Sequence, residues 1–444
     1  MKEGAGSMLI RGGSVLLEAA GAPGGARGVE ILEGLDVLVS GDRIAYVGPT
    51  GSAPAAATCV EYDATGQVVM PGFVNGHTHC SMTLLRGYAQ DMTLDDWLRK
   101  RIWPAEGRMT PEDIHWGALL GCVEMIAAGV TSFCDMYFKM DGVAEAVEAS
   151  GLRALLSQGM AGLNQADRRR TWDASLELYH RWNGGAGGRI RVILGPHAPY
   201  TCPPDFLEEV GRLSTELGVQ VTIHLAETRD EVEECLRRHG KTPVRLAFDS
   251  GLASVGMIAA HCVHAGEEDV RLLGSPRAAA VHCPVSNLNL ACGIAPVARM
   301  LTAGVTVALG TDGPASGSTH EMFTAMRLAT LAQKHLTGDP TALPATRALW
   351  MATRGGALAL GLGDTGAIRE GMKADMICVS TKGPHFQPGL DAGACLVHCA
   401  RPEDVRLVMV DGRVLKKDDQ VLTLDEEVIR REVEARAKRI VKSA

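Results

Sequence analysis

The stretch PGFVNGHTH, residues 71–79, decides the fold of this chain and gives the first sign of its chemistry. It ends an apolar run that starts at Val68 and is typical of a β-strand closed by Gly76 and a polar triplet. Side chains two residues apart on a strand point the same way, so His77 and His79 should face one side. Neutral imidazoles are good ligands for zinc or ferrous iron. The stretch therefore predicts a strand whose end carries part of a metal site.

Seven further segments of the same kind follow along the chain. Each is a short apolar or β-branched run that ends in a polar or glycine cluster, and segments of helical periodicity separate them. Such alternation predicts an α/β fold, a (β/α)₈ TIM-type barrel. A doubly wound sheet is the alternative, but no GxGxxG follows the first strand. The expected strands are 68–79, 130–136, 153–159, 191–197, 221–227, 257–264, 278–284 and 305–313, and two of the expected helices are 111–129 and 204–218.

Both ends of the chain differ from this middle part. Residues 7–65 and 366–422 contain short strands separated by Gly-Asp, Asp-Gly and Thr-Gly turns, which are typical of hairpins. Two β-rich ends around a barrel can pair into one small β-sandwich. We therefore expect residues 1–67 and 364–444 to form a composite β-sandwich domain with a C-terminal helix, and residues 68–363 to form the barrel domain.

Composition narrows the class of protein. The 444 residues are 46% hydrophobic and 22% charged, with 44 Lys and Arg against 52 Asp and Glu, which gives a net charge of −8. This balance argues against a nucleic-acid partner, which would need a basic face. No apolar run approaches the roughly 18–20 residues of a membrane span. The N-terminus has no apolar signal region, and twelve cysteines form no CxxC pair, so we expect reduced thiols and a cytoplasmic location.

Polar residues gather at the expected strand ends, where barrel enzymes carry their active sites. Seven of the 14 histidines lie at such ends. His224 on the fifth strand offers a third metal ligand, and Asp312 after the eighth offers a carboxylate. Glu227 lies at the same end as His224 and can move protons for a metal-activated water, with His261 and Asp312 orienting that water. An acid in the first turn of the next helix is the structural alternative for Glu227.

These motifs resemble those of the amidohydrolase superfamily. The resemblance rests on PGFVNGHTH, HLAET, AAHCVH, HCPVSN and GTDG, and it covers nearly the whole chain. It implies one metal held by His77, His79, His224 and Asp312. Members with two metals use a lysine on the fourth strand, and this chain has no lysine between Lys139 and Lys241. The resemblance therefore implies a single divalent metal, Zn²⁺ or Fe²⁺, as in the deaminase branch.

Three longer stretches are similar to those of methylthioadenosine/S-adenosylhomocysteine deaminases. They are MTLLRGYAQDMTLDDWLRKRIWPAE (82–106), GPHAPYT (195–201) and SNLNLACGIAPVARM (286–300). The similarity implies deamination of an adenine nucleoside with a variable 5′ group, such as adenosine, 5′-deoxyadenosine, methylthioadenosine or S-adenosylhomocysteine. It also implies that Glu106 binds the ribose hydroxyls and that His197 contacts the substrate.

The chain departs from that family near the 5′ group. Some members carry an arginine after the third strand and another about twelve residues on. Here Gln158 takes the first position, and the second falls near Arg168–Arg170. The stretch after Asp312 is GPASGSTHEM, from which we expect Ser316 to contact substrate.

Two other functions compete with this hypothesis. One is a deaminase or chlorohydrolase of another N-heterocycle, such as guanine, a pterin or an s-triazine, with the same four ligands. Glu106 distinguishes a nucleoside deaminase from an enzyme of free heterocycles, because an acid that binds ribose has no role when the substrate has no ribose. The other is a non-catalytic scaffold of the same fold, but such proteins usually lose ligands that are all present here. The expected partners are a small heterocyclic molecule and, as in many family members, further copies of the chain in a homo-oligomer.

Overall fold

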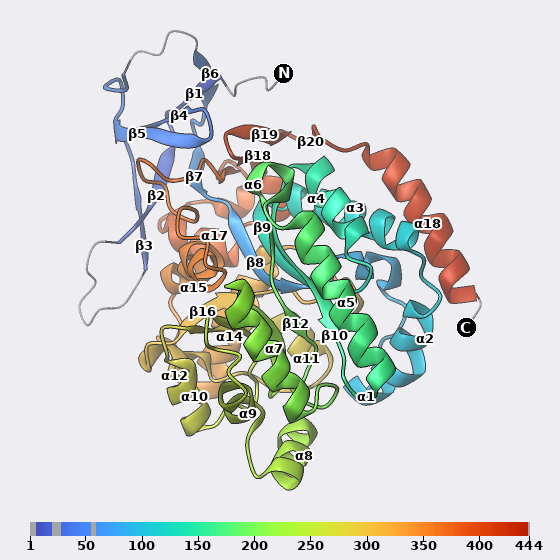
Figure 1. The fold of residues 1–444 in the computed structure, drawn as a ribbon. Helices are drawn as coiled ribbons and strands as arrows, with labels where there is room; N and C mark the ends of the chain where they lie inside the picture. The colour runs from blue at the N-terminus through green and yellow to red at the C-terminus, as the bar shows by residue number, and fades with distance from the viewer. Residues whose placement is uncertain (1–5, 20–27, 55–58, 443–444) are drawn as a thin grey trace.

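The computed structural model describes residues 6–19, 28–54 and 59–442, and its centre is the expected barrel of parallel strands (Figure 1). Four strands pair in one run and four in another. A bridge between Leu194 and Val221 joins the two runs on one side. On the other side, the Asp312 N–H donates to the His77 carbonyl at 3.0 Å and closes the barrel. The strands are β8 (Phe73–Thr78), β9 (Val130–Tyr137), β10 (Arg153–Met160), β11 (Ile190–Val192) continued by β12 (Gly195–Pro196), β13 (Val221–Leu225), β14 (Met257–His261), β15 (Ala278–His282) and β16 (Thr306–Leu309).

Helices between these strands form the outer layer. The predicted helix over 111–129 is α3 (Pro111–Ala127), which begins with a capping box between Thr110 and Asp113. The predicted helix over 204–218 is α7 (Pro204–Leu217), which ends at the left-handed Gly218. None of the helices within the described ranges is long and apolar enough to cross a membrane. The others include α4 (Asp141–Ser150), α5 (Gln165–Trp182), α8 (Arg229–His239), α9 (Pro243–Asp249), α10 (Glu267–Leu273), α12 (Val297–Thr302), α14 (Met322–Thr337), α15 (Ala345–Ala352) and α16 (Arg354–Ala359).

Glycines bring β8 and β16 close together where the polar residues lie. A Cβ on Gly310 would lie 2.9 Å from a Val281 methyl carbon and 3.0 Å from the His77 backbone. A Cβ on Gly76 would lie 3.0 Å from the Leu309 carbonyl oxygen. Only glycine fits such a close approach of two backbones. The glycines of VNGHTH and ALGTDG thus let the two motifs meet at one end of the barrel.

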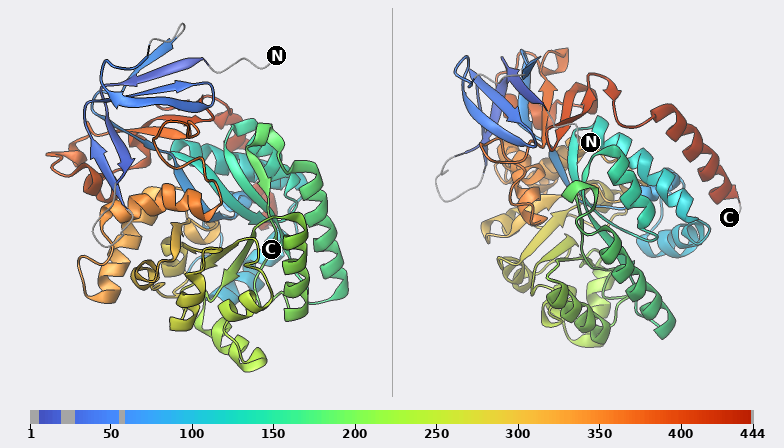
Figure 2. Two further views of the ribbon diagram at one scale, coloured as in Figure 1. Left: turned by 60° about the vertical axis from the view of Figure 1, so that its left-hand side comes forward. Right: turned by 45° about the horizontal axis from the view of Figure 1, so that its top comes forward.

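The β-rich ends of the chain combine in two sheets beside the barrel, and Figure 2 shows their N-terminal and C-terminal strands side by side. One sheet has the order β5-β4-β1-β6, and the other has the order β20-β19-β18-β17-β7-β2-β3. An apolar cluster that includes Val37, Val69 and Met376 lies between them. The strands are β1 (Ser7–Arg11), β2 (Ser14–Glu18), β3 (Val29–Leu32), β4 (Leu35–Ser40), β5 (Arg43–Pro49), β6 (Cys59–Asp63), β7 (Gln67–Pro71), β17 (Met376–Ser380), β18 (Val405–Val410), β19 (Arg413–Lys417) and β20 (Gln420–Val421).

The expected first barrel strand, 68–79, is two strands in the structure. Residues Gln67–Pro71 form β7, which pairs with β17 and β2 in the mixed sheet, and Phe73–Thr78 form β8 in the barrel. The break falls at Gly72, where a Cβ would lie 2.1 Å from the Thr131 side chain. One run of sequence therefore serves both parts of the molecule. The boundary between residues 67 and 68, which we expect to separate the β-sandwich domain from the barrel domain, remains a proposal.

The C-terminal helix α18 (Glu426–Lys442) lies against the start of α3 (Figure 1). Arg436 Nη1 lies 3.1 Å from the Asp113 carboxylate, which is fully buried, and Arg439 donates to the other oxygen of that carboxylate. The predicted C-terminal helix is thus held against α3 by ion pairs.

A buried ion pair ties the barrel to the mixed sheet, and its loss should destabilise the protein. Arg153 begins β10, and its Nε lies 2.7 Å from Asp375, just before β17. Both side chains are almost completely buried. Removing one partner of such a pair costs about 3–5 kcal/mol, because the other charge stays buried. We expect Arg153→Met to lower the free energy of urea unfolding by that amount.

An exposed pair provides the control. Arg181 lies 3.0 Å from Asp141 on the surface. Exposed pairs contribute about 0–1 kcal/mol, so Arg181→Met should unfold almost like the wild type. Equal, small losses in both variants would contradict the structural role given to Arg153.

Candidate metal centre and active site

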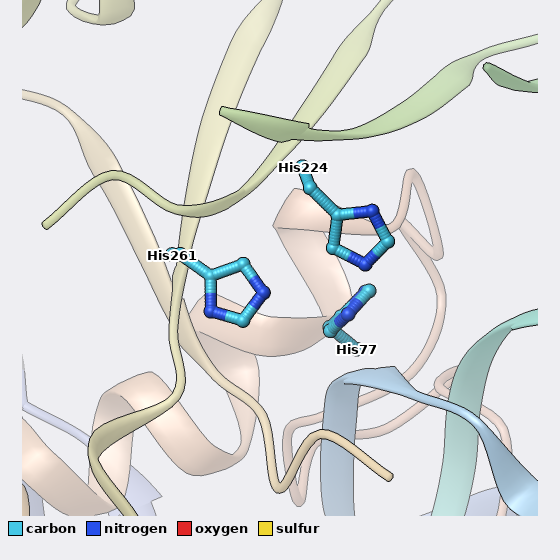
Figure 3. Close-up of side chains that lie close together, drawn as sticks. All are labelled: His77, His224 and His261. Carbon is cyan, nitrogen blue, oxygen red and sulfur yellow. The ribbon is translucent and has the colours of Figure 1, made fainter. Parts of the chain in front are cut away.

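Four strand ends bring the predicted metal and catalytic residues together. His77 lies next to last on β8 and His79 follows that strand, His224 lies on β13, His261 ends β14, and Asp312 follows β16. Figure 3 shows the rings of His77, His224 and His261 converging from three different strands. All three are at least nine-tenths buried. The structure thus places these side chains together at one end of the barrel.

The ligand atoms of this cluster lie within a few ångströms of one another. Asp312 Oδ1 is 3.2 Å from His79 Nε2 and 3.6 Å from His77 Nε2. His224 Nε2 is 3.4 Å from His79 Nε2. Three overlapping groups of possible metal ligands result within the described residues: His77–His79–Asp312, His77–His224–His261 and Glu227–His261–Asp312.

Backbone carbonyls orient two of the rings. His79 Nδ1 donates to the Met136 carbonyl at 2.5 Å, and His224 Nδ1 donates to the His197 carbonyl at 2.7 Å. A histidine that donates through one nitrogen presents the other to a metal. Asp135, beside Met136 on β9, accepts the N–H of Cys80 at 2.6 Å and so holds the chain directly after His79.

The cluster has the chemistry that a divalent cation requires. Both ring nitrogens of the fully buried His77 lack any hydrogen-bond partner, and buried polar atoms are rarely left so. Burial lowers the pKa of His77 to about 4, so this ring is neutral. Burial also lowers the pKa of His79, but the Asp312 carboxylate outweighs it and raises that pKa to about 9. The site thus favours a positive charge beside Asp312. Neutral imidazoles together with a carboxylate are ligands that suit zinc or iron.

Asp312 is held by residues whose role the sequence analysis missed. Its Oδ2 accepts from Ser286 Oγ at 2.6 Å and from Ser316 Oγ at 3.1 Å, and its Oδ1 accepts the Gly313 N–H at 2.8 Å. Ser286 starts the SNLNL stretch and lies on α11 (Pro284–Asn289). Ser316 lies on α13 (Pro314–Gly317). We expected it to contact substrate, and in the structure its hydroxyl donates a hydrogen bond to Asp312.

Glu227 lies beside this cluster with its side chain buried. Its Oε1 is 3.7 Å from His261 Nδ1 and 3.9 Å from the Cys292 thiol. Burial, together with the charge of Asp312, raises the pKa of Glu227 to about 8. Asn287 Nδ2 is 2.9 Å from His261 Nδ1 and fixes that ring. An acid next to a metal cluster can accept and return a proton near neutral pH.

A cavity of about 600 Å³ opens from the cluster toward the surface. This volume suits a small organic ligand. The predicted substrate residues Glu106, Gln158 and His197 all line it. The Tyr137 hydroxyl donates to Glu106 Oε1 at 2.7 Å, and His197 Nδ1 is 2.9 Å from the Thr201 hydroxyl. The wall on the Glu106 side comes from α1 (Leu94–Trp97), the π-helical turn Leu98–Ile102 and α2 (Trp103–Glu106).

Of the three arginines at 168–170, Arg170 alone lines the cavity. Arg168 pairs with Asp205 at 2.7 Å and lies over the Phe206 ring on the outside of α5. Arg169 is exposed and pairs with Asp173 along the helix. Arg170 pairs with Asp167 at 3.0 Å. The structure therefore singles out Arg170 as the cation of this run that can approach a ligand.

A TIM-type barrel with a His/Asp metal cluster and an adjacent buried acid defines a metal-dependent hydrolase. A sequence profile of the amidohydrolase family matches residues 68–415, and the chain belongs to that family. Among its relatives, the 5-methylthioadenosine/S-adenosylhomocysteine deaminase of Pelotomaculum thermopropionicum is 50% identical over 407 residues, which are 91% of this chain and 94% of the relative.

Solved structures support the same assignment. The adenosine deaminase of Xanthomonas campestris with bound zinc is 32% identical, covers 98% of both chains and has a TM-score of 0.91. The atrazine chlorohydrolase of Arthrobacter aurescens TC1, complexed with zinc, is 26% identical over 97% of this chain and 100% of that one, with a TM-score of 0.88. The predicted family and the predicted fold are both confirmed.

Proposed function

We propose that this protein is a metal-dependent hydrolytic deaminase of adenine nucleosides with a variable 5′ group. The observation that carries the proposal is one cavity that has the metal cluster and Glu227 at its inner end and Glu106 on its wall. The similarity to a methylthioadenosine/S-adenosylhomocysteine deaminase at 50% identity and to an adenosine deaminase supports it. The reaction replaces the exocyclic amino group of adenine by oxygen from water and releases ammonia.

We propose a single zinc ion, with iron as the alternative, held by His77, His79, His224 and Asp312. Two similar solved proteins contain zinc. Such an ion lowers the pKa of a bound water toward about 7 and so supplies a nucleophile at neutral pH. The fourth barrel strand, which carries the bridging lysine in two-metal members, leads here to His197, whose ring lies on the cavity wall.

Glu227 moves the protons of the reaction. As a carboxylate it accepts a proton from the attacking water, and it returns protons to the purine ring and to the amino group, which leaves as ammonia. His261 lies between Glu227 and Asp312, where its buried ring can donate a hydrogen bond to the incoming oxygen. Ser286 and Ser316 fix Oδ2 of Asp312, so its Oδ1 stays on the side of His77 and His79, where it can orient the attacking water.

Glu106 binds the ribose in this proposal. Tyr137 occupies one side of its Oε1, and the rest of the carboxylate faces the cavity. A carboxylate can accept from two vicinal hydroxyls, which is together worth roughly 3 kcal/mol, or about a hundredfold in catalytic efficiency. We expect wild type to prefer adenosine strongly over 2′,3′-dideoxyadenosine. Glu106→Ala should lose that preference while it keeps its metal, and steady-state assays of both nucleosides measure it.

Tyr137→Phe is the matched control for this experiment. It removes the hydrogen bond to Glu106 but leaves the carboxylate, so the preference for ribose hydroxyls should survive. Equal use of both nucleosides by the wild type would count against a nucleoside substrate.

The 5′ group meets a mixed environment. Gln158 is neutral, Arg170 is already paired with Asp167, and Trp97, Leu98 and Leu178 supply apolar wall. We therefore propose that neutral 5′ groups such as hydroxyl, hydrogen or methylthio are used at least as well as homocysteine. A strong preference for S-adenosylhomocysteine would mean that Arg170 leaves Asp167 and binds its carboxylate.

A second candidate is hydrolysis of another N-heterocycle. The likeness to an atrazine chlorohydrolase over nearly the whole chain favours it. Activity that requires no ribose and is unaffected by Glu106→Ala would select this candidate. A non-catalytic scaffold of the same fold, the other alternative, would be selected if the purified protein bound no metal. Assembly into a homo-oligomer and a cytoplasmic location stay predictions.

A further inference from the structure

We infer that Glu231 is a positioning residue of this active site, which holds the backbone of Glu227 so that its carboxyl faces the substrate. The inference rests on the proposed function, because it concerns the proton-transferring role given there to Glu227. Glu231 lies four residues further along the chain, on the first turn of α8. It does not line the cavity and therefore acts through Glu227.

Both oxygens of Glu231 bind the loop between β13 and α8. Its Oε1 accepts the Ala226 N–H at 2.9 Å, and its Oε2 accepts the Glu227 N–H at 2.8 Å. The residue is 8% exposed. Burial raises the pKa of Glu231 to about 8, while the two backbone N–H groups oppose this rise. A buried carboxyl group whose two oxygens accept from consecutive N–H groups fixes the position of the peptide between them.

The backbone at this point needs support. Ala226 has φ +50, in the left-handed region that a residue with a Cβ rarely adopts. Such residues persist when the surroundings hold them, and they are common at active sites. The carbonyls of Leu225 and Ala226 accept from the N–H groups of Cys262 and His264 at 3.0 and 2.9 Å. Glu231 accepts from the N–H groups of Ala226 and Glu227 in the same turn. Hydrogen bonds therefore hold both the carbonyl groups and the N–H groups of the turn that carries Glu227.

Ordinary helix capping does not account for this arrangement. In a capping box, the acid at the third helical position reaches back to the N–H of the cap residue. Here the cap residue is Thr228, whose side chain does accept the Glu231 N–H at 3.2 Å. The Glu231 carboxylate, however, passes over Thr228 and binds the two residues before it. Its contacts therefore serve the end of β13, where Glu227 lies, and not the helix.

The test compares Glu231→Gln with Thr228→Ala in the zinc-loaded protein, with adenosine as the probe. A glutamine has one acceptor oxygen, and its amide nitrogen would face the second N–H. We expect kcat to fall about tenfold to a hundredfold, with KM within about twofold and metal content unchanged. Thr228→Ala removes the hydroxyl that caps α8 and should lower Tm while it keeps kcat within about twofold.

A double-mutant cycle separates positioning from general structural support. If Glu231 acts through Glu227, then Glu227→Gln with Glu231→Gln should be no slower than Glu227→Gln alone. The inference is overturned if Glu231→Gln keeps a kcat within about twofold of wild type, or if its full rate loss reappears in the Glu227→Gln background. Should Glu231→Gln fail to fold, Glu231→Asp, which retains the carboxyl group but is too short to reach both N–H groups, takes its place with the same expectations.

The outcomes also distinguish the two proposals. A near-normal rate of Glu227→Gln would remove the proton-transfer role on which this inference depends. An inactive Glu227→Gln together with a fully active Glu231→Gln would leave the proposed function intact and overturn only the role of Glu231.

Discussion

Glu227→Gln should retain its metal and lose at least about a hundredfold in kcat, because general acid–base groups typically contribute about 10²–10⁴-fold. The amide has nearly the same shape as the carboxyl, but it cannot accept a proton from water or pass one to the departing amine. KM for adenosine should change little, since Glu227 lies beside the ligand cluster and the proposed ribose contact is made by Glu106 on the cavity wall. Steady-state kinetics and elemental analysis of the same preparation measure both effects.

Cys292→Ala is the matched control for Glu227→Gln. It removes the thiol 3.9 Å from Glu227 Oε1 and leaves the acid itself. Its rate should stay close to that of the wild type. A Glu227→Gln variant with near-normal turnover would place the proton relay elsewhere, with His261 the next group to test.

His77→Ala and Asp312→Ala should each lose metal and activity together. Both side chains lie in the ligand cluster, and each offers a donor atom close to the other proposed ligands. Loss of a residue that only orients a metal ligand typically costs about 10–100-fold in metal affinity, so loss of a ligand itself should cost more. The barrel should stay folded, which circular dichroism checks, while elemental analysis reports the metal per chain.

His264→Ala provides the comparison for the metal content. His264 follows β14 closely, but its Nε2 bonds the Cys292 carbonyl at 2.8 Å and it belongs to none of the ligand groups. It should keep a full complement of metal. Two tightly bound ions per active chain, both needed for turnover, would contradict the single-metal proposal.

The sequence allowed the barrel and the ligand cluster to be predicted because both rest on local patterns. Each strand end carries its own signal, as in VNGHTH or ALGTDG, and the barrel brings those ends together. The break at Gly72 could not be read in the same way. It depends on the Thr131 side chain, which comes from a strand far along the chain.

The residues that support the site were harder to find. Ser286 and Glu231 both lie in the first turns of short segments after strands, where serine and glutamate are common for capping reasons alone. Their roles appear only when the fold places Ser286 Oγ 2.6 Å from Asp312 and the Glu231 carboxylate against the Glu227 N–H. Ser316 shows the converse, because its position after Asp312 suggested substrate contact, whereas its hydroxyl bonds the carboxylate of Asp312.

Ammonia release by the purified, zinc-loaded protein is the measurement that tests the central proposal most directly. The panel comprises adenosine, 5′-deoxyadenosine, methylthioadenosine, S-adenosylhomocysteine, guanine and melamine, each with and without prior removal of the metal by a chelator. We predict metal-dependent release of one ammonia per adenine nucleoside, with the neutral 5′ groups used at least as well as homocysteine. Turnover of guanine or melamine without turnover of any adenine nucleoside would contradict the account.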